Sequence, residues 1–157
     1  MYKMDIYSRC LLTRNVTLPV TAIDRNIQGT LGAQIAAKYE GICVAEGFIK
    51  RGSSKLVTHS SGRVLRTSDI SFEVVFECDV CFPVENMQIP CVAKNITKAG
   101  VRAESSTEVP SPFVAFVVRD HNQDLSAVKE GDKITVRVIG QRFELNDKYV
   151  SIVGEIV

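Results

Sequence analysis

Alternation of apolar and polar side chains is the main pattern along the chain. It is clearest in residues 71–84, where every even position is apolar and the odd positions include Glu73, Glu77 and Asp79. A period of two over this length predicts a long β-strand with one buried face. Similar runs predict at least seven strands in all. The predicted strands span residues 7–19, 42–50, 55–59, 71–84, 89–96, 101–105, 113–119, 134–145 and 149–157.

One segment instead has the period of an α-helix. Its apolar residues recur at every fourth position: Ile23, Ile27, Leu31, Ile35 and Tyr39. Thr21 and Asp24 have the spacing of a capping box, and Gly41 stands where the helix would end. A second stripe consists of small residues, which we expect to pack closely against a sheet: Gly29, Ala33 and Ala37.

The order of these elements divides the chain into two parts, which meet near residues 82–86, where Pro83 interrupts the strand pattern. The first part contains a strand, the helix and several further strands. The second part contains only strands and turns, with the spacing of a five-stranded Greek-key barrel of the OB type. We therefore expect two small domains, at residues 1–82 and 83–157.

Composition excludes several classes of protein. The chain has 157 residues, 45% hydrophobic and 24% charged, with a formal net charge of +1, so bulk positive charge cannot drive nucleic-acid binding. A membrane helix needs about 18 consecutive apolar residues, and no window approaches this. Residues 1–10 also lack the apolar core of a signal peptide. The five cysteines are an odd number without a secretory mark, which favours a reducing compartment over a disulfide framework.

The motif most suggestive of chemistry is Cys78-Asp-Val-Cys81. A redox motif would begin a helix after a strand, and a zinc site would need a second pair of ligands. Within a strand, residues three apart point to opposite faces, so we expect Cys78 in the core and Cys81 partly exposed. Neither His59 nor His121 accompanies a nucleophile elbow, and the chain has no P-loop or dinucleotide fingerprint. We therefore expect no enzyme active site, no metal and no other cofactor.

Positive charge is concentrated in residues 47–68, which contain five basic residues and no acidic one, a local charge of +5. The five are Lys50, Arg51, Lys55, Arg63 and Arg66. A surface of this kind can bind an acidic partner or a phosphate backbone. The alternative is a basic hairpin that is simply solvated.

The second part has its own candidates for nucleic-acid binding. Basic residues lie on or beside the expected barrel strands: Lys94, Lys98, Arg102, Arg119, Arg137 and Arg142. OB barrels bind single strands by combining such cations with aromatic platforms. The aromatic candidates are Phe113, Phe116 and Phe143, of which alternation places at least one in the core. Acidic residues nearly balance the basic ones here, so we expect weak, salt-sensitive binding.

Several short patches, taken in order, resemble the stalk subunit of multisubunit DNA-dependent RNA polymerases, the eukaryotic seventh-subunit and archaeal E-prime family. The patches are Glu40-Gly-Ile-Cys43, Gly47-Phe-Ile49, Ser61-Gly-Arg-Val-Leu65, the strand of residues 72–82 running into Pro83-Val84, and Tyr149-Val-Ser-Ile-Val-Gly-Glu-Ile156. Together with the element order they cover essentially the whole chain. The resemblance implies an α+β fold, in which an N-terminal RNP-like domain with one helix on an antiparallel sheet precedes an S1-type OB-fold β-barrel.

The resemblance also implies a non-catalytic subunit, with catalysis in the large polymerase subunits. The N-terminal domain would dock on the polymerase core through Lys50, Arg51, Gly62, Arg63, Val64, Leu65 and Arg66. The barrel would contact emerging RNA through some of Lys94, Lys98, Arg102, Arg119 and Arg142. A small helical stalk partner would bind along the seam between the domains. The chain is shorter than typical cellular members, which suits a homologue from a large DNA virus.

A cellular member would be nuclear, whereas a viral one would lie in the host cytoplasm or the virion.

Two other functions stay open on the residues alone. The first is a free-standing S1-type RNA-binding factor in translation or RNA decay, which leaves the helix and the basic segment unexplained. The second is a thiol redox or zinc protein built on Cys78 and Cys81, which metal analysis and a thiol titration would reveal.

Overall fold

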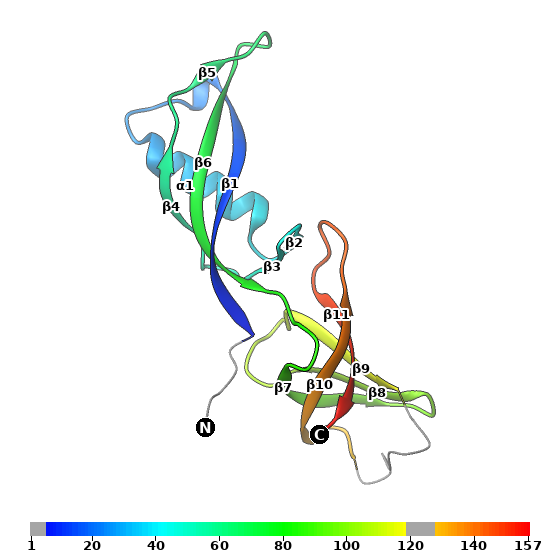
Figure 1. Cartoon of the computed structure of the whole chain (residues 1–157). Helices are drawn as coiled ribbons and strands as arrows, with labels where there is room; N and C mark the ends of the chain where they lie inside the picture. The colour runs from blue at the N-terminus through cyan, green and yellow to red at the C-terminus, as the bar shows by residue number, and fades with distance from the viewer. Residues whose placement is uncertain (1–5, 119–127) are drawn as a thin grey trace. The chain divides into compact units, whose positions relative to one another are not determined.

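The computed structural model describes residues 6–118 and 128–157, which form two compact units (Figure 1). The first unit consists of Tyr7–Gly41 and Ile49–Val80, and the second consists of Ile6, Ile42–Phe48 and Cys81–Val157. The fold is mostly β, with one α-helix in the part of the chain that is described. None of the described helices has the length and apolar character that a membrane span requires.

The first unit is organised around one long strand, β6 (Asp69–Cys81). β1 (Tyr7–Pro19) lies along one edge of β6. Along the other edge follow the end of β3 (Gly47–Ile49), then β4 (Lys55–His59), then β5 (Arg63–Val64), with β4 and β5 antiparallel to β6. The long strand predicted from alternation is therefore confirmed, whereas the two-residue β5 was not predicted.

The helix α1 (Ile27–Tyr39) covers one face of this sheet. Its side chains Leu31 and Ile35 are fully buried, and Tyr39 stacks on Phe76 of β6 with ring centroids 5.8 Å apart. The even residues of β6 from Phe72 to Cys78 complete this core, as their alternation predicted. The C-terminal stop is confirmed, because Gly41 follows the C-cap Glu40 with φ +78°, a conformation that glycine adopts without strain.

Two expectations about this helix are wrong. The N-cap is Asn26, whose side chain accepts the Gly29 N–H, and not a Thr21/Asp24 box, because residues 20–22 form the separate 3₁₀ turn η1 (Val20–Ala22). The stripe of small residues, Gly29, Ala33 and Ala37, is exposed. It lies two positions from Leu31 and Ile35, which is about 200° around a helix and therefore on the solvent face.

Residues 42–50 form a hairpin and not the single strand that was predicted. β2 (Cys43–Val44) and β3 are antiparallel, with Cys43 opposite Phe48 and a two-residue turn at Ala45 and Glu46. Cys43 exchanges backbone hydrogen bonds with a turn near the C-terminal end of the chain: its N–H donates to the Asp147 carbonyl at 2.8 Å, and its carbonyl accepts the Asn146 N–H at 2.9 Å. Residues 42–48 thus belong with the second unit, whereas the expected boundary at residues 82–83 places them with the first.

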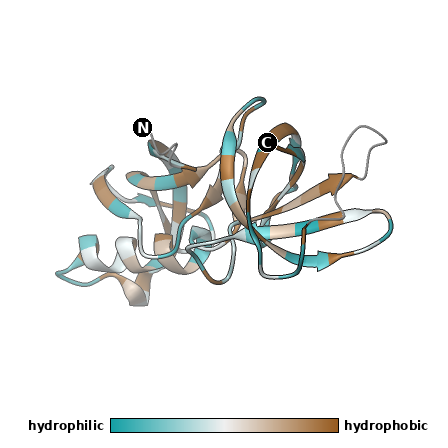
Figure 2. Ribbon diagram, turned by 90° about the horizontal axis from the view of Figure 1, so that it is seen from below, coloured by the Kyte–Doolittle hydropathy of each residue, from teal (hydrophilic) through white to brown (hydrophobic). Residues whose placement is uncertain are grey.

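The second unit is a closed five-stranded, OB-like barrel, as the strand spacing predicted. Its strands are β7 (Gln88–Ile96), β8 (Gly100–Ser105), β9 (Phe113–Val118), β10 (Lys133–Arg142) and β11 (Val150–Ile156). They follow the order β7-β8-β9-β11-β10, and β10 pairs with β7 to close the barrel. Only β9 and β11 are parallel among these pairs. Figure 2 shows apolar and polar residues following one another along the strands. The buried apolar residues of these strands form the barrel core.

Candidate docking and nucleic-acid interfaces

One end of the first unit is a basic hairpin tip formed by residues 60–68. β5 pairs with the start of β6, and the Leu65 N–H donates to the Asp69 carbonyl at 2.8 Å to close the turn. Arg63 and Arg66 are exposed, and the Val64 side chain is 72% exposed. Gly62 permits the close packing of this hairpin, since a Cβ there would lie 2.6 Å from the Ile70 side chain. The tip thus presents two arginines around an apolar side chain.

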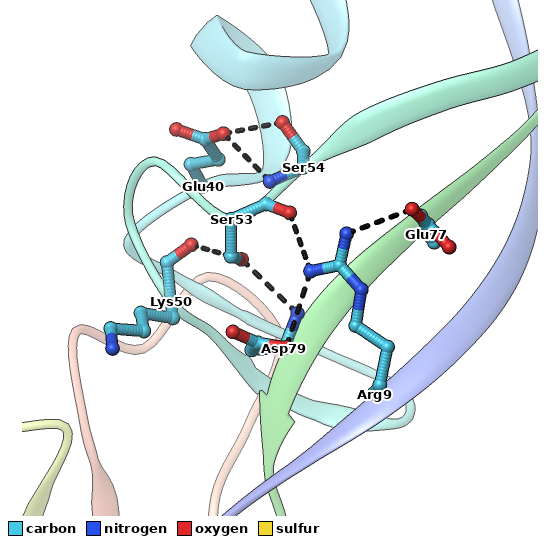
Figure 3. Close-up of polar contacts among 7 residues, drawn as sticks. All are labelled: Arg9, Glu40, Lys50, Ser53, Ser54, Glu77 and Asp79. Carbon is cyan, nitrogen blue, oxygen red and sulfur yellow. Dashed lines mark hydrogen bonds and ion pairs between the residues drawn. The ribbon is translucent and has the colours of Figure 1, made fainter.

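The turn of residues 50–54, between β3 and β4, holds the other two predicted docking residues, Lys50 and Arg51. Glu40, at the C-cap of α1, accepts the Gly52 N–H at 2.9 Å and the Ser54 N–H at 3.2 Å, as well as the Ser54 hydroxyl. The Glu40 carboxylate therefore satisfies three donors of this turn and fixes its conformation. Figure 3 shows its two contacts with Ser54.

Arg9 of β1 holds the same turn from the opposite side, as Figure 3 shows. Its guanidinium donates to the Ser53 carbonyl at 2.8 Å and forms ion pairs with Asp79 at 3.2 Å and Glu77 at 3.1 Å. The hydrogen bond to Glu77 and, as a smaller cause, the one to Asp79 raise the pKa of Arg9. The Ser53 hydroxyl donates to the Lys50 carbonyl at 2.6 Å and accepts the Asp79 N–H at 3.1 Å. The backbone that carries Lys50 and Arg51 is thus fixed from three elements.

The structure separates the seven predicted docking residues into two groups. Lys50 lies beside Asp79 near the end of β6, since its N–H donates to the Asp79 carbonyl at 2.9 Å. Val64 lies opposite Ile70 near the start of β6. Nine residues of strand separate these two points, which corresponds to about 30 Å. Lys50 with Arg51, and Gly62 through Arg66, are therefore distinct surfaces that can be tested separately.

On the barrel, three of the five predicted RNA-binding residues lie close together on neighbouring strands. Lys94 belongs to β7, Lys98 to the following turn and Arg102 to β8, and all three are exposed. Arg102 lies opposite Asn95, the residue after Lys94. Arg142, also exposed, lies at the end of β10 opposite Ser151. Arg119 lies outside the described residues.

An apolar row starts beside Arg102 and runs across the outer face of the barrel to β10. Arg102 on β8 is opposite Phe116 on β9, Phe116 is level with Val153 on β11, and Val153 is opposite Gly140 on β10. Phe116 is 37% exposed, while Phe113 is fully buried, which confirms that at least one aromatic candidate belongs to the core. Phe143 is half-buried and contacts Phe82 edge to face, with ring centroids 6.0 Å apart. Phe116 is therefore the aromatic platform that this face offers.

Nearby carboxylates reduce the positive charge of the barrel face. Arg102 lies 3.9 Å from Glu104, Arg142 lies 3.8 Å from Glu144, and Arg137 pairs with Glu155. Exposed ion pairs of this kind contribute little to stability, but each acidic partner offsets a charge that a phosphate would otherwise meet. The arrangement suits weak contact with a single strand.

Four of the five cysteines are buried, whereas Cys10 is half-buried. Cys43 and Cys91 are buried, and burial raises the pKa of Cys43 to about 11, with the Asp147 carboxylate adding to the effect, and that of Cys91 to about 12. Cys78 is buried as predicted. The expectation that Cys81 is partly exposed is wrong, because Val80 and Cys81 are both buried and alternation stops at the end of β6. The described residues contain no group of three or more His, Cys, Asp or Glu side chains placed to hold a metal ion.

Sequence reasoning missed the residues that hold these surfaces in place. Glu40 lies at least twelve residues from its hydrogen-bond partners, and Arg9 lies 70 residues from Asp79. No local motif marks such contacts. Val153 was predictable as an outward residue from the alternation of the last strand, but its position beside Phe116 depends on the parallel pairing of β9 and β11.

Comparison with known proteins finds a similarity to a viral protein. The chain is 21% identical to a protein of Acanthamoeba polyphaga mimivirus described as a "Putative DNA-directed RNA polymerase subunit". The alignment spans the whole of this chain and 85% of the viral protein. No family model matches the chain.

Proposed function

We propose that this protein is a non-catalytic stalk subunit of a DNA-directed RNA polymerase, which docks on the core enzyme and contacts nascent RNA. The observation that carries the proposal is the similarity, along the whole chain, to a viral protein described as a polymerase subunit. The OB-like barrel and the helix-covered sheet of the first unit support it, and we assign these as the S1-type and RNP-like domains of a stalk subunit. The viral relative favours a viral origin, with the protein in the host cytoplasm or virion.

The basic surfaces of the first unit are the proposed contacts with the core enzyme. Arg63 and Arg66 would pair with acidic groups of the core, while Val64 would become buried at the centre of the contact. Such an interface gains most from its desolvated centre, and the charges mainly steer association. Lys50 and Arg51 would form a second contact at the other end of β6.

Charge reversal of each group tests this docking. Arg63→Glu with Arg66→Glu should abolish co-purification of the polymerase large subunits, and Lys50→Glu with Arg51→Glu should weaken it. The matched control is Lys133→Glu with Lys148→Glu, two exposed lysines of the barrel unit. Circular dichroism verifies that each variant stays folded. Full recovery of the large subunits with both docking variants would refute the assignment.

The apolar row on the barrel, which begins beside Arg102, is the proposed contact with RNA, and Arg142 lies two residues beyond its end on β10. A base can stack on Phe116 while Lys94, Lys98 and Arg102 meet phosphates. Stacking on an aromatic side chain contributes about 1–3 kcal/mol per base. Neutralising about three phosphates gives a slope near −2 in a plot of log K against log salt concentration for a single strand.

Fluorescence anisotropy with a labelled oligouridine measures this contact. We expect a micromolar Kd at low salt, a loss of at least about fivefold with Phe116→Ala, and a flatter salt dependence when Lys94, Lys98 and Arg102 are changed together to Gln. The control is Lys133→Gln with Lys148→Gln. Equal binding by all variants would remove this face from the proposal.

A helical stalk partner has a candidate surface on the second unit. Large apolar residues are exposed or half-buried on two segments that meet at the Phe82–Phe143 contact: Phe82, Val84, Phe143, Leu145 and Tyr149. Exposed apolar groups that gather in one place are typical of a protein interface. Leu145→Asp should therefore prevent co-purification of the small partner without affecting RNA binding.

A further inference from the structure

β4 is paired along only one of its edges in the described part of the first unit. It is antiparallel to β6, and no other described strand pairs with it. Figure 1 shows β4 at the margin of the sheet, beside α1. Val57, in the middle of β4, is 54% exposed. A strand with a free edge carries backbone donors and acceptors that another strand can use.

The pairing with β6 shows which peptide groups of β4 are free. The Ser60 N–H donates to the Glu73 carbonyl at 2.8 Å, and the Lys50 N–H donates to the Asp79 carbonyl on the same edge. The backbone groups of odd-numbered residues of β6 therefore point toward β4, and those of even-numbered residues point away from it. A residue of β4 that lies opposite an even-numbered residue of β6 consequently directs its N–H and C=O groups to the free edge of β4. These residues are Leu56, opposite Phe76, and His59, opposite Val74.

A groove of about 420 Å³ runs beside this free edge. One wall is β4, through Leu56, Val57, Thr58 and His59, and the other is the start of α1, through Asn26, Gln28 and Gly29. The two residues with outward peptide groups thus both line the groove. Its volume lies toward the lower end of the range for small-ligand sites, which suits a short extended segment.

The charge around the groove favours an acidic occupant. None of the residues that line it is acidic, and the first turn of α1 has no acidic residue. Arg25 and Lys55 are exposed and directly precede Asn26 and Leu56, which line the two walls of the groove. Asp24 is turned toward the start of the helix, where its carboxylate accepts the Asn26 N–H at 3.0 Å and the Thr30 hydroxyl at 3.5 Å.

We propose that the groove receives a short, acidic, extended segment of a partner protein, which adds to the sheet as a strand beside β4. Main-chain hydrogen bonds to Leu56 and His59 hold the segment, Val57 packs against one of its apolar side chains, and Arg25 and Lys55 pair with its carboxylates. The register shift between Leu56 and Thr58 and the charge of Lys55 limit the strand to a short, matching segment, because bulges and edge lysines prevent general pairing. The site is independent of the docking and RNA surfaces proposed above.

Peptide probes with an N-methyl scan test strand addition on the unmodified full chain. The probe is a capped fluorescent peptide in which valine and aspartate alternate. Two derivatives carry N-methyl groups on alternate residues, one on the odd and one on the even positions. Only one of these sets can face β4, so one derivative should lose about fivefold in affinity for each hydrogen bond removed, and the other should bind as the parent does.

Three further readouts complete the test. A valine–lysine peptide should bind at least tenfold more weakly than the valine–aspartate peptide. The variant Arg25→Glu with Lys55→Glu should weaken binding of the acidic peptide, whereas the control Lys133→Glu with Lys148→Glu, two exposed lysines of the barrel unit, should not. Amide exchange measured by NMR should slow at Leu56 and His59 when the peptide binds. Equal loss with both N-methyl derivatives, unchanged exchange at these amides, or displacement of the peptide by RNA alone would overturn the proposal.

Discussion

Gly154 of β11 lies so close to the neighbouring strand of the barrel that an added methyl group would disturb the packing. A Cβ at this position would lie 2.6 Å from the Arg137 carbonyl oxygen and would also overlap the Val136 side chain. The carbonyl belongs to the neighbouring strand β10 and cannot rotate away, so β10 and β11 must separate. Overpacking of a core in this way costs about 1–3 kcal/mol. Gly154→Ala should therefore destabilise the barrel by this amount.

Gly140 of β10 is the matched control, because a Cβ there would have no neighbouring heavy atom within 4 Å. Gly140→Ala should be neutral or should stabilise the strand by about 0.5–1 kcal/mol, since alanine loses less conformational entropy on folding than glycine. Urea unfolding followed by circular dichroism measures both changes. With a slope of about 1–3 kcal/mol per molar, the midpoints of the two variants should differ by roughly 1 M. Coincident midpoints would refute the packing argument.

Three further predictions concern the interior and the docking turn. Burial raises the pKa of Cys43 to about 11 and that of Cys91 to about 12, from an ordinary value of 9.0. As the pH rises, the unfolded chain therefore loses its thiol protons before the folded chain does. Thermal stability should fall as the pH rises from 9 toward 12, and it should fall less steeply in a Cys43→Ala, Cys91→Ala variant. Glu40→Ala leaves the donors of residues 52–54 without their carboxylate. It should therefore lower the free energy of unfolding, measured in urea titrations, by about 1–3 kcal/mol. It should also weaken polymerase binding, as Lys50→Glu with Arg51→Glu does. Phe76→Ala should cost about 3–5 kcal/mol because Phe76 is fully buried, whereas the half-exposed Phe116→Ala should change stability little, and the same titrations compare the two.

The strands of the barrel and β6 were predictable because each buries one face, so a period of two survives in the sequence. Short elements leave no such period: β5 has two residues, and the hairpin of residues 42–50 keeps its alternation through the turn at Ala45 and Glu46. The helix period located α1, but the buried face is set by Leu31 and Ile35, and the small residues that suggested close packing lie on the opposite side.

The candidate sites were predictable as residue types and not as surfaces. Lys50 and Arg66 were grouped because they are near in sequence. The segments that carry them lie beside opposite ends of β6. In the barrel, Lys94, Lys98 and Arg102 come together because β7 and β8 are consecutive and antiparallel, which the strand order already implied. The neighbourhood of Phe116 and Val153 required the long-range pairing of β9 with β11.

Assembly with a polymerase is the central claim, and purification from the source organism tests it directly. The full chain, carrying an affinity tag, is expressed there and isolated under mild salt, and the proteins bound to it are identified by mass spectrometry. The large catalytic subunits of a DNA-directed RNA polymerase should be recovered in about equal molar amount with the tagged wild-type chain. They should be absent when Arg63 and Arg66 are changed to Glu. Recovery of RNA or ribosomal proteins without any polymerase subunit would contradict the account and favour a free-standing RNA-binding factor.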